Sequence, residues 1–419
     1  MKGSTARKLR QIPEGSLLVG IDPHKKQHAV VVMTAQTQVV SRFKVSNSME
    51  GFDELCQGVE RLVRTGAARG AIYGLEAGGH YWRNVAYFLE GQGQPFRLIN
   101  PYTLKRRREG DDLDRRKNDF RDALMAAELL RTGKFTETRL LYGVYAQLRA
   151  SYQAYRRLRN QLSRTVNLLR ALLDGLFPEF CQVFKSVTGK TALAILSIGS
   201  TPEAIAAMAL EDLVQKVRTA YIGRRLLLKQ LKALHALAQR SIGVRAGAEA
   251  VSTEVSCLAE QSRVLQCQMQ RWEQSLSGLV RALPESQPLL SIPGVGPLTV
   301  AGLLGELGPL EGYRNAKQLV KMAGTNPTQS ESAGKNSPHT PMSKKGRSGL
   351  RWCLWMASVR LMRHNPDFAR WATERLQRPA QAHPLKPREV IGAVGNRFLR
   401  VAYALVKQNR SYQVQAIAL

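Results

Sequence analysis

Apolar residues over the first 135 positions come in short runs that predict buried β-strands. The runs over 16–22 and 27–34 are rich in Leu, Ile and Val, and a third strand is expected over 39–45. Further strands are predicted over 71–76 and 96–99. The first three strands follow one another directly, so we expect them to form a meander.

Helical stretches separate the later strands. They are predicted over 49–64, from residue 80 onward, and over about 117–131. Three strands followed by helix, strand, helix, strand and helix give a mixed α/β sheet with helices on both faces. This is the order of elements in an RNase H-like fold.

Apolar residues recur at steps of three and four over 141–173, which predicts one long helix with an apolar seam. A second run over 255–283 has the same spacing, interrupted only by Ser262. Two such helices can pair as a coiled coil, within one chain or between subunits. We interpret the Ala- and Leu-rich segment between them, roughly 185–250, as a small helical insertion.

A Gly-rich turn marks a third region. The turn Ile292-Pro-Gly-Val-Gly-Pro297 opens a helix, and all-α structure continues with helices over 350–363 and 390–407. A long polar stretch over 324–349 lies between them. We therefore expect three parts: an RNase H-like domain over 1–135, a coiled-coil linker with a helical insertion over 136–284, and a helical C-terminal domain over 285–419.

The chain is strongly basic. Its 419 residues include 62 Lys and Arg against 32 Asp and Glu, a formal net charge of +30. With 44% apolar residues the chain can bury substantial cores, which excludes wholesale disorder. An excess of like charge repels itself, and a polyanion neutralises it while releasing counterions. Nucleic acid is therefore the expected partner.

The five cysteines lie far apart, with no CxxC pair and no His spacing suited to zinc. Disulfides and structural zinc are not expected, and the compartment should be a reducing cytosol. The apolar stretch over 17–22, which follows the basic N-terminus, is too short for a signal sequence or a membrane span.

Four carboxylates can converge in the first domain. Asp22 and Glu76 end two predicted strands, and Asp119 and Asp122 lie one turn apart on the last helix. Such a cluster needs cations, and hard oxygen ligands select Mg²⁺ or Mn²⁺, which can hold and polarise a phosphodiester. Spacing leaves open the alternative that Asp119 and Asp122 pair with neighbouring arginines on a solvated helix face. It also leaves other acids open as the last two ligands, namely Asp111, Asp112 and Asp114.

Seven histidines are scattered along the chain. Only His24 and His28 share local spacing, and both lie beside Asp22. We interpret them as part of a surface turn rather than as metal ligands.

The Pro-Gly-Val-Gly turn resembles a helix-hairpin-helix, in which backbone N–H groups at a helix N-terminus receive a DNA phosphate. Gly294 and Gly296 would permit this close approach. Any tight turn between helices can also use such glycines. Sequence-specific contacts are not expected from it.

Basic residues form two candidate nucleic-acid tracks, because they outnumber the acids nearby. Tyr142 and Tyr145 interleave with the second track and can stack on unpaired bases, whereas Tyr152 and Tyr155 lie on the seam and are expected to pack. The first track comprises Lys105, Arg106, Arg107, Arg108, Arg115, Arg116 and Lys117, and the second comprises Arg149, Arg156, Arg157, Arg159, Arg164 and Arg170.

The polar stretch combines serines with cations. A hydroxyl can attack phosphorus when a base, or a metal and cations, stabilise the developing charge. On the residues alone, we favour a phosphate-binding loop whose serines only donate hydrogen bonds. The serines are Ser330, Ser332, Ser337, Ser343 and Ser348, and the cations are Lys335, Lys344, Lys345, Arg347 and Arg351.

Taken together, these motifs resemble the DEDD transposases of a bacterial insertion-sequence family, the serine recombinases guided by a bridge RNA. The resemblance covers roughly 16–180 and 285–410, and the order and spacing of its motifs are specific. The matching pieces are Val19-Gly-Ile-Asp22-Pro-His-Lys, Gly74-Leu-Glu76-Ala-Gly-Gly, Ile99-Asn-Pro101, Lys117-Asn-Asp119-Phe-Arg-Asp122-Ala, Ile292-Pro-Gly-Val-Gly296, Ala323-Gly-Thr-Asn-Pro327, Glu331-Ser332-Ala-Gly334, and Pro341-Met-Ser-Lys-Lys-Gly346 with Leu350-Arg351.

The resemblance implies a RuvC-like domain in which Asp22, Glu76, Asp119 and Asp122 ligate Mg²⁺, with Mn²⁺ as an alternative. It also implies a transposase domain whose nucleophile is Ser332. The Ser332 hydroxyl would attack a DNA phosphodiester, giving a phosphoserine link and a free 3′-hydroxyl before exchange and religation. The energy of the broken bond stays in the ester, so no ATP is needed.

The resemblance also implies the partners. These are donor and target DNA, a structured noncoding guide RNA, and further copies of the chain in a dimer or tetramer, in the cytoplasm and associated with the nucleoid. Acids and serine would form one site across subunits. Base pairing to the RNA would choose the target.

Two departures from the family pattern are present: Ser332-Ala-Gly where Ser-Gly is expected, and the long insertion between the seam helices. Two rival functions remain. One is a junction-resolving nuclease in which a metal activates water and no covalent serine link forms. The other is a nonenzymatic RNA-binding protein.

Overall fold

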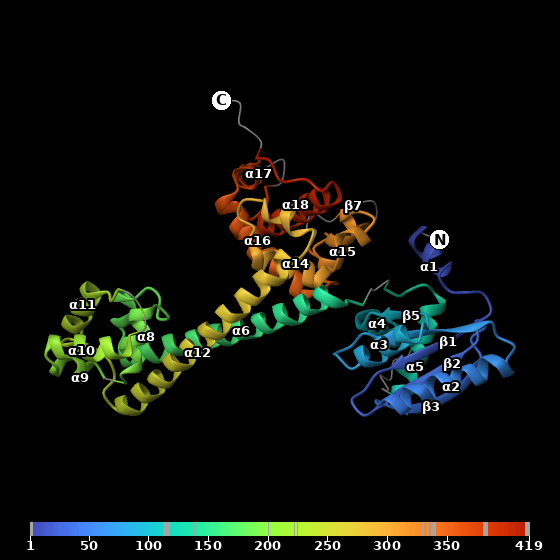
Figure 1. Cartoon of the computed structure of the whole chain (residues 1–419), viewed down its shortest axis with the longest axis horizontal. Coiled ribbons are helices and arrows are strands. Elements are labelled where there is room, and N and C mark those ends of the chain that lie inside the picture. Colours follow the sequence, from blue (N-terminus) through green and yellow to red (C-terminus); the bar gives the residue numbers. More distant parts are fainter. Residues whose placement is uncertain are drawn as a thin grey trace. The chain divides into compact units, whose positions relative to one another are not determined.

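The structure is a computed structural model, in which the chain divides into two compact units, Met1–Leu140 and Leu141–Leu419 (Figure 1). The first unit is a sheet covered by helices, and the second is mostly helical. The three-part division expected from the sequence stays a prediction. The residues described are 3–111, 118–136, 140–199, 201–221, 223, 225–328, 331–332, 335–336, 341–379 and 384–414.

A five-stranded mixed sheet forms the centre of the first unit, as the apolar runs predicted. Its strands are β1 (Ser16–Asp22), β2 (Gln27–Met33), β3 (Val39–Ser46), β4 (Gly70–Glu76) and β5 (Phe96–Ile99). The order across the sheet is β3–β2–β1–β4–β5. The first three strands pair antiparallel, and β1, β4 and β5 pair parallel. This arrangement is consistent with an RNase H-like fold.

Helices cover both faces of this sheet (Figure 1). Alternate residues of β1 point to opposite faces, so Val19 and Ile21 pack with α2 (Met49–Thr65) and α3 (Trp82–Gly91). Leu18 packs on the other face with α4 (Pro101–Asp111) and α5 (Asp119–Arg131). Both faces of β1 are therefore buried, which explains its continuous apolar run.

Two helices of the first unit are not predicted by the apolar pattern. They are α1 (Gly3–Leu9) and α4. The α4 helix is highly polar, but its start carries a helix signal: the Asn100 side chain accepts a hydrogen bond from the backbone N–H of Tyr102 at 2.9 Å, and Pro101 is the first helical residue. This helix brings Arg108 into the site described below.

Two long helices, α6 (Gly143–Leu176) and α12 (Ala248–Arg281), lie side by side in the second unit (Figure 1). The predicted apolar seam is confirmed, because Leu148, Leu169 and Leu276 are fully buried. Ser262 is also fully buried, and its hydroxyl donates to the backbone oxygen of Leu258 at 2.8 Å. Supercoiling of the pair stays a prediction.

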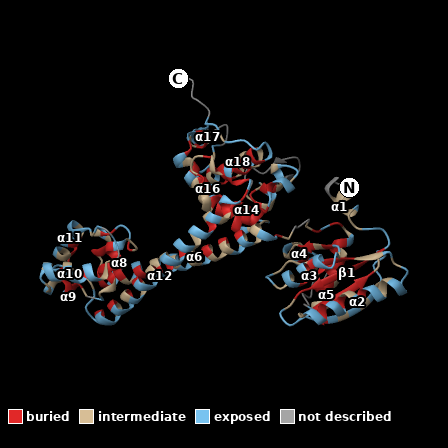
Figure 2. Ribbon diagram, viewed as in Figure 1, coloured by how far each residue is buried: buried red, intermediate tan, exposed pale blue. Residues whose placement is uncertain are grey.

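The segment between these helices forms a small helical group with its own buried cluster (Figure 2). This cluster includes Leu173 of α6 and Val255 of α12. The backbone N–H of Val244 donates to the backbone oxygen of Gly175 at 2.9 Å, so the segment leaves and returns at one point. Its helices are α7 (Phe180–Val183), α8 (Lys190–Ser197), α9 (Pro202–Ala207), α10 (Leu210–Ala220) and α11 (Leu228–Ala238).

The C-terminal region packs around α14 (Pro297–Leu307), whose residues from Thr299 to Leu307 are all buried (Figure 2). The other helices are α13 (Ser286–Leu290), α15 (Ala316–Ala323), α16 (Ser348–His364), α17 (Pro366–Leu376) and α18 (Pro387–Lys407). Two short strands, β6 (Glu331–Ser332) and β7 (Lys335–Asn336), pair with each other. Among the described residues, we find no helix with the length and apolar character that crossing a bilayer requires.

Candidate active site

The register of the sheet places Asp22 beside Glu76. Strands β1 and β4 run parallel with Ile21 opposite Leu75, so the next residue of each strand is an acid at the same edge of the sheet. Both acids alternate onto the face that carries Leu18, which is the face covered by α5. The sequence therefore directs both carboxylates toward one helix.

Two glycines let α5 approach this face closely. A Cβ atom on Gly20 would lie 1.8 Å from the backbone oxygen of Ala123, and one on Gly74 would lie 2.7 Å from the side chain of Leu130. The two glycines face each other across β1 and β4. The first turn of α5, capped by Asn118, consequently reaches the edge where the strand acids lie.

Three of the four predicted acids meet at this edge. Asp22, Glu76 and Asp122 each offer a carboxylate oxygen, and these oxygens all lie within 4.8 Å of one another. Asp122 is 2% exposed, and the Nε atom of Arg108 lies 3.1 Å from its Oδ1. The alternative of a solvated helix face is therefore wrong for Asp122.

Asp119, the fourth acid, lies at the exposed margin of the cluster. Its Oδ2 is 3.5 Å from the Nζ of Lys44, and its Oδ1 is 3.4 Å from the Nε2 of His24. The same His24 nitrogen lies 3.0 Å from Oδ2 of Asp22. Asp22, His24 and Asp119 thus form a second group of possible metal ligands that shares Asp22 with the first.

His28 does not belong to a surface turn, contrary to expectation. It is fully buried in β2, where its ring stacks on Phe52 with 5.6 Å between centroids. Burial lowers the pKa of His28 to about 4, so its imidazole is neutral. Its Nδ1 accepts a hydrogen bond of 3.1 Å from the backbone N–H of His24.

The electrostatics of the cluster fit a divalent cation. Burial, together with the charges of Asp22 and Asp122, raises the pKa of Glu76 to about 7, while Arg108 opposes this shift. Without a cation, the cluster therefore holds a proton close to neutral pH. Oxygen donors at this spacing are the ligands that Mg²⁺ and Mn²⁺ prefer, and an ion would replace that proton.

The Ser332 segment differs from the long polar loop predicted by its composition, because its two ends pair. The backbone N–H of Thr328 donates to the oxygen of Pro341, that of Ser343 to Asn326, and that of Lys344 to Gly324, each at 2.9 Å. Further along, Ser332 in β6 pairs with Lys335 in β7. For Ser332 and Lys335 only the backbone is described, and Ser330 and Ser337 lie outside the described residues.

A glycine contact closes the base of this segment. A Cβ atom on Gly346 would lie 2.4 Å from the backbone N of Gly324, and Gly324 itself has a φ of +65°. Arg351 donates to the backbone oxygens of Gly346 at 2.8 Å and Ala323 at 3.0 Å. Arg347 donates to the backbone oxygen of Glu306. Both arginines thus support the segment, whereas Lys344 and Lys345 are exposed.

The Gly-rich turn has the predicted form. Gly294 has a φ of +89°, a conformation that favours glycine, and Gly296 precedes the first residue of α14. A Cβ atom on Gly296 would meet nothing within 4 Å, so this position is open. Phosphate binding by the turn stays a prediction.

The first basic track is largely engaged within its own domain. Lys105 lies 3.7 Å from Glu109, Arg107 lies 3.1 Å from Glu128, and Arg108 pairs with Asp122. The Arg106 guanidinium lies 5.0 Å from the ring centre of Tyr102. Three of the four cations of α4 in this track therefore lie beside acids, and Arg106 lies beside an aromatic ring. Arg115, Arg116 and Lys117 lie outside the described residues.

The second track contains residues of two kinds. Arg156 lies over the Trp352 ring at 5.2 Å from its centre, whereas Arg157 is exposed. Tyr145 donates to Glu285 at 2.8 Å, and the seam residues Tyr152 and Tyr155 are buried as expected. Arg157 therefore stays the better candidate for contact with a polyanion.

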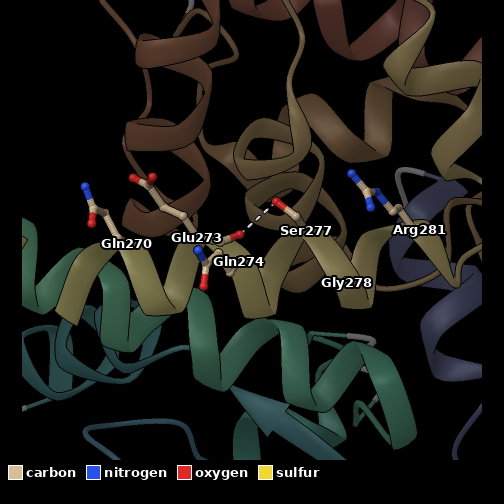
Figure 3. A pocket seen from close by; sticks show the side chains of 6 residues that line it. All are labelled: Gln270, Glu273, Gln274, Ser277, Gly278 and Arg281. Atoms are coloured by element: carbon tan, nitrogen blue, oxygen red, sulfur yellow. Dashed lines mark hydrogen bonds between the residues drawn. The ribbon is translucent and has the colours of Figure 1, made fainter. Parts of the chain in front are cut away.

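A depression on α12 is lined by residues of that helix alone (Figure 3). There the Ser277 hydroxyl donates to the backbone oxygen of Glu273 at 2.7 Å, and Tyr155 of α6 donates to the Glu273 carboxylate at 3.0 Å. The first contact lies within α12, and the second joins α6 to α12. The residues that line it are Gln270, Glu273, Gln274, Ser277, Gly278 and Arg281, and we assign them no chemistry.

Two models of transposase families match this chain. The IS110-type DEDD transposase model matches residues 19–178, and the model of the transposase IS116/IS110/IS902 family matches residues 286–372. The first range contains the four acids and the second contains Ser332.

Two relatives match most of the chain, and a third matches about a third of it. An uncharacterized 44.8 kDa protein of insertion element IS116 from Streptomyces clavuligerus is 26% identical over 83% of this chain and 86% of its own length. A mini-circle putative transposase for IS117 from Streptomyces coelicolor is 24% identical over 82% of this chain and 84% of its own length. A pilin gene-inverting protein of Moraxella bovis is 26% identical over 32% of this chain and 42% of its own length.

Proposed function

This chain belongs to the IS110/IS116 family of transposases, enzymes that act on DNA, and from that premise we propose that it cleaves and rejoins DNA with the Ser332 hydroxyl as nucleophile. The observation that carries the proposal is the convergence of Asp22, Glu76 and Asp122 from β1, β4 and α5, with oxygens within 4.8 Å of one another. A buried, cation-binding group of acids suits phosphodiester chemistry.

The acids would hold Mg²⁺ or Mn²⁺, which supplies charge stabilisation at the scissile phosphate when bound. Arg108 keeps Asp122 oriented through the contact of 3.1 Å. Lys44 and His24 flank Asp119 on its two oxygens. The residues of the chain therefore order the carboxylates before substrate arrives, which is the main contribution of a preorganised site.

In the proposed reaction, the Ser332 oxygen forms a bond to phosphorus while the bond from phosphorus to the 3′ oxygen breaks. The serine proton passes to a base, and the departing oxygen takes up a proton to become a free 3′-hydroxyl. Attack of a 3′-hydroxyl on the phosphoserine reverses the step and releases the serine. Each step exchanges one phosphate ester for another, so no ATP is needed. The proposal requires Ser332 and the acids to meet in the assembled complex, across subunits.

Nucleic acids are the proposed partners. A net charge of +30 favours polyanions, and exposed cations such as Arg157 and Lys344 can contact phosphates. The motifs shared with bridge-RNA-guided recombinases support a structured guide RNA, with the target chosen by base pairing. We further propose a dimer or tetramer that works in the cytoplasm at the nucleoid.

The test is a search for a covalent protein–DNA adduct. The full chain is incubated with candidate noncoding RNA, a DNA duplex and Mg²⁺, and the products are separated under denaturing conditions. Ser332→Ala should lose the adduct and keep metal binding, whereas Ser348→Ala, an exposed serine at the start of α16, should keep both. Undiminished strand cleavage by Ser332→Ala would reject the serine nucleophile and favour the junction-resolving nuclease.

A second pair of variants separates enzymes from a binding protein. Replacing Asp119 and Asp122 by Asn removes two carboxylates from the cluster. Both enzymatic functions require cleavage to fall, by at least about a hundredfold. Retained RNA binding with no cleavage by the wild-type chain under any metal would favour the nonenzymatic RNA-binding protein.

A further inference from the structure

His24 lies inside the carboxylate cluster, and the proposed reaction gives it no role of its own. Its Nε2 is 3.0 Å from Oδ2 of Asp22 and 3.4 Å from Oδ1 of Asp119. One nitrogen therefore faces two carboxylates from different elements, one at the end of β1 and one in the first turn of α5. The side chain is 41% exposed, so solutes reach it from solvent.

The backbone holds His24 in this place. Its N–H donates to Nδ1 of His28, a fully buried residue whose ring stacks on Phe52. A polar ring in the core costs free energy unless its nitrogens are used, and this hydrogen bond uses one of them. The turn after Asp22 is thus tied to the core, and His24 is directed back toward Asp22.

The possible metal ligands form two groups of three that share one member. Asp22, Glu76 and Asp122 form the first, and Asp22, His24 and Asp119 form the second, each with its ligand atoms within 4.8 Å of one another. A carboxylate shared between two ligand sets is typical of two-metal sites, in which the ions lie about 3.5–4 Å apart. Two ions at such a distance clamp both the attacking and the leaving oxygen of a phosphodiester.

We propose that Asp22, His24 and Asp119 bind a second divalent cation beside the one held by Asp22, Glu76 and Asp122. This inference rests on the proposed metal-dependent function and extends it to a ligand outside the four acids. The two sites differ in donor chemistry, because the first offers oxygen alone and the second adds an imidazole nitrogen. Nitrogen donors favour transition metals, so the second site selects Mn²⁺ over Mg²⁺ more strongly than the first.

Mn²⁺ binding to the full chain, followed by electron paramagnetic resonance, tests the proposal without an activity assay. Titration should give about two Mn²⁺ per chain, and pulsed spectra should show coupling to a ¹⁴N nucleus. Two Mn²⁺ ions are expected, and only one should show nitrogen coupling. Excess Mg²⁺ should displace the ion that shows no nitrogen coupling before it displaces the other. Labelling the histidines with ¹⁵N should replace the ¹⁴N coupling by that of ¹⁵N, which identifies the ligand in the unaltered chain.

Matched variants assign the nitrogen. His24→Gln should bind one Mn²⁺ fewer and lose the coupling, whereas Glu76→Gln should weaken the other ion and keep the coupling. His235→Gln is the control, because His235 is a histidine of the second unit whose Nε2 lies 2.9 Å from the backbone oxygen of Met208. It should keep both ions and the coupling.

The possible failures are distinct. If the wild-type chain binds Mn²⁺ without nitrogen coupling, or if His24→Gln binds as many ions as the wild type, His24 only donates a hydrogen bond and this inference is wrong. The metal-dependent function would then still stand. If the wild-type chain binds no divalent cation even with nucleic acid present, the proposed function fails as well.

Discussion

The carboxylate site gathers acids from elements far apart in the sequence, whereas Ser332 lies in one continuous segment whose two ends pair. Both depend on a backbone contact that only glycine permits: Gly20 against α5 in the first case and Gly346 against Gly324 in the second. The first contact lies within the core of a domain, and the second joins only the ends of one segment. Metal binding should therefore fail together with the fold, while serine chemistry can fail alone.

The largest effect is expected from Gly20→Ala. The new methyl group would lie 1.8 Å from the Ala123 oxygen, so α5 must move away from β1. We expect a loss of about 3 kcal/mol in the free energy of unfolding, measured with urea, and weaker Mn²⁺ binding.

Gly70→Ala in β4 is the matched control, because a Cβ atom there meets nothing within 4 Å. It should change the free energy of unfolding by less than about 0.5 kcal/mol. Equal stability of the two variants would show that the close approach of α5 does not hold the site together.

Gly346→Ala should separate the two regions. Its methyl group would lie 2.4 Å from the backbone of Gly324, which opens the base of the Ser332 segment. We expect a loss of about 1–2 kcal/mol and at least tenfold less protein–DNA adduct, with Mn²⁺ affinity unchanged. Gly278→Ala on α12, where nothing lies within 4 Å of a Cβ atom, is the control. A parallel loss of Mn²⁺ binding would contradict the independence of the two regions.

The acid cluster should make metal-free stability depend on pH. The pKa of Glu76 rises from 4.5 to about 7 on folding, so its contribution is fully present below pH 4.5 and is lost as the pH rises through 7. After allowance for solvent screening, we expect about 1 kcal/mol between pH 5 and pH 8. Urea unfolding at both pH values, with Glu76→Gln as reference, measures the difference. Added Mg²⁺ should restore stability at pH 8, since it replaces the proton.

The smallest effects are expected from the arginines of α6. They distinguish an arginine that stabilises the fold from one that contacts nucleic acid. Arg157→Gln should change the free energy of unfolding by less than about 0.5 kcal/mol. It should reduce the slope of the logarithm of nucleic-acid affinity against the logarithm of salt concentration by about one. Arg156→Gln should lose about 1 kcal/mol, because its guanidinium lies over Trp352. Nucleic-acid titrations at several salt concentrations decide the first, and urea unfolding decides the second. An unchanged salt dependence in Arg157→Gln would remove this residue from the track.

Asp22 and Glu76 could be predicted as site residues because the sequence indicates where the two strands end. The run that ends at Asp22 and the one that ends at Glu76 are continuous and apolar, so their last residues fall at one edge of a parallel pair. Asp119 and Asp122 followed from helical spacing, although the burial of Asp122 depends on Gly20 and could not be inferred locally. The succession of strands along the chain and the helices α2, α3 and α5 followed from the same patterns, whereas the order of strands across the sheet is a finding of the structure.

Features fixed by distant contacts were missed. The position of His24 depends on the hydrogen bond from its backbone N–H to His28, which is buried in β2. The local sequence around these two histidines does not indicate that burial. The Arg108 contact depends on α4, a helix without apolar periodicity. Pairing of the ends of the Ser332 segment was hidden because polar residues carry no strand pattern, and the pairing depends on a glycine contact across the segment.

The hydrogen bond between Val244 and Gly175 has a consequence for the evolution of the chain. The segment leaves and rejoins the helix pair at one point, and its buried cluster includes residues of the ends of α6 and α12 as well as its own. Its length can grow or shrink over generations without shifting the register of α6 on α12. Differences in length between relatives should therefore occur in the segment between Gly175 and Val244, whereas α6 and α12 should keep their lengths.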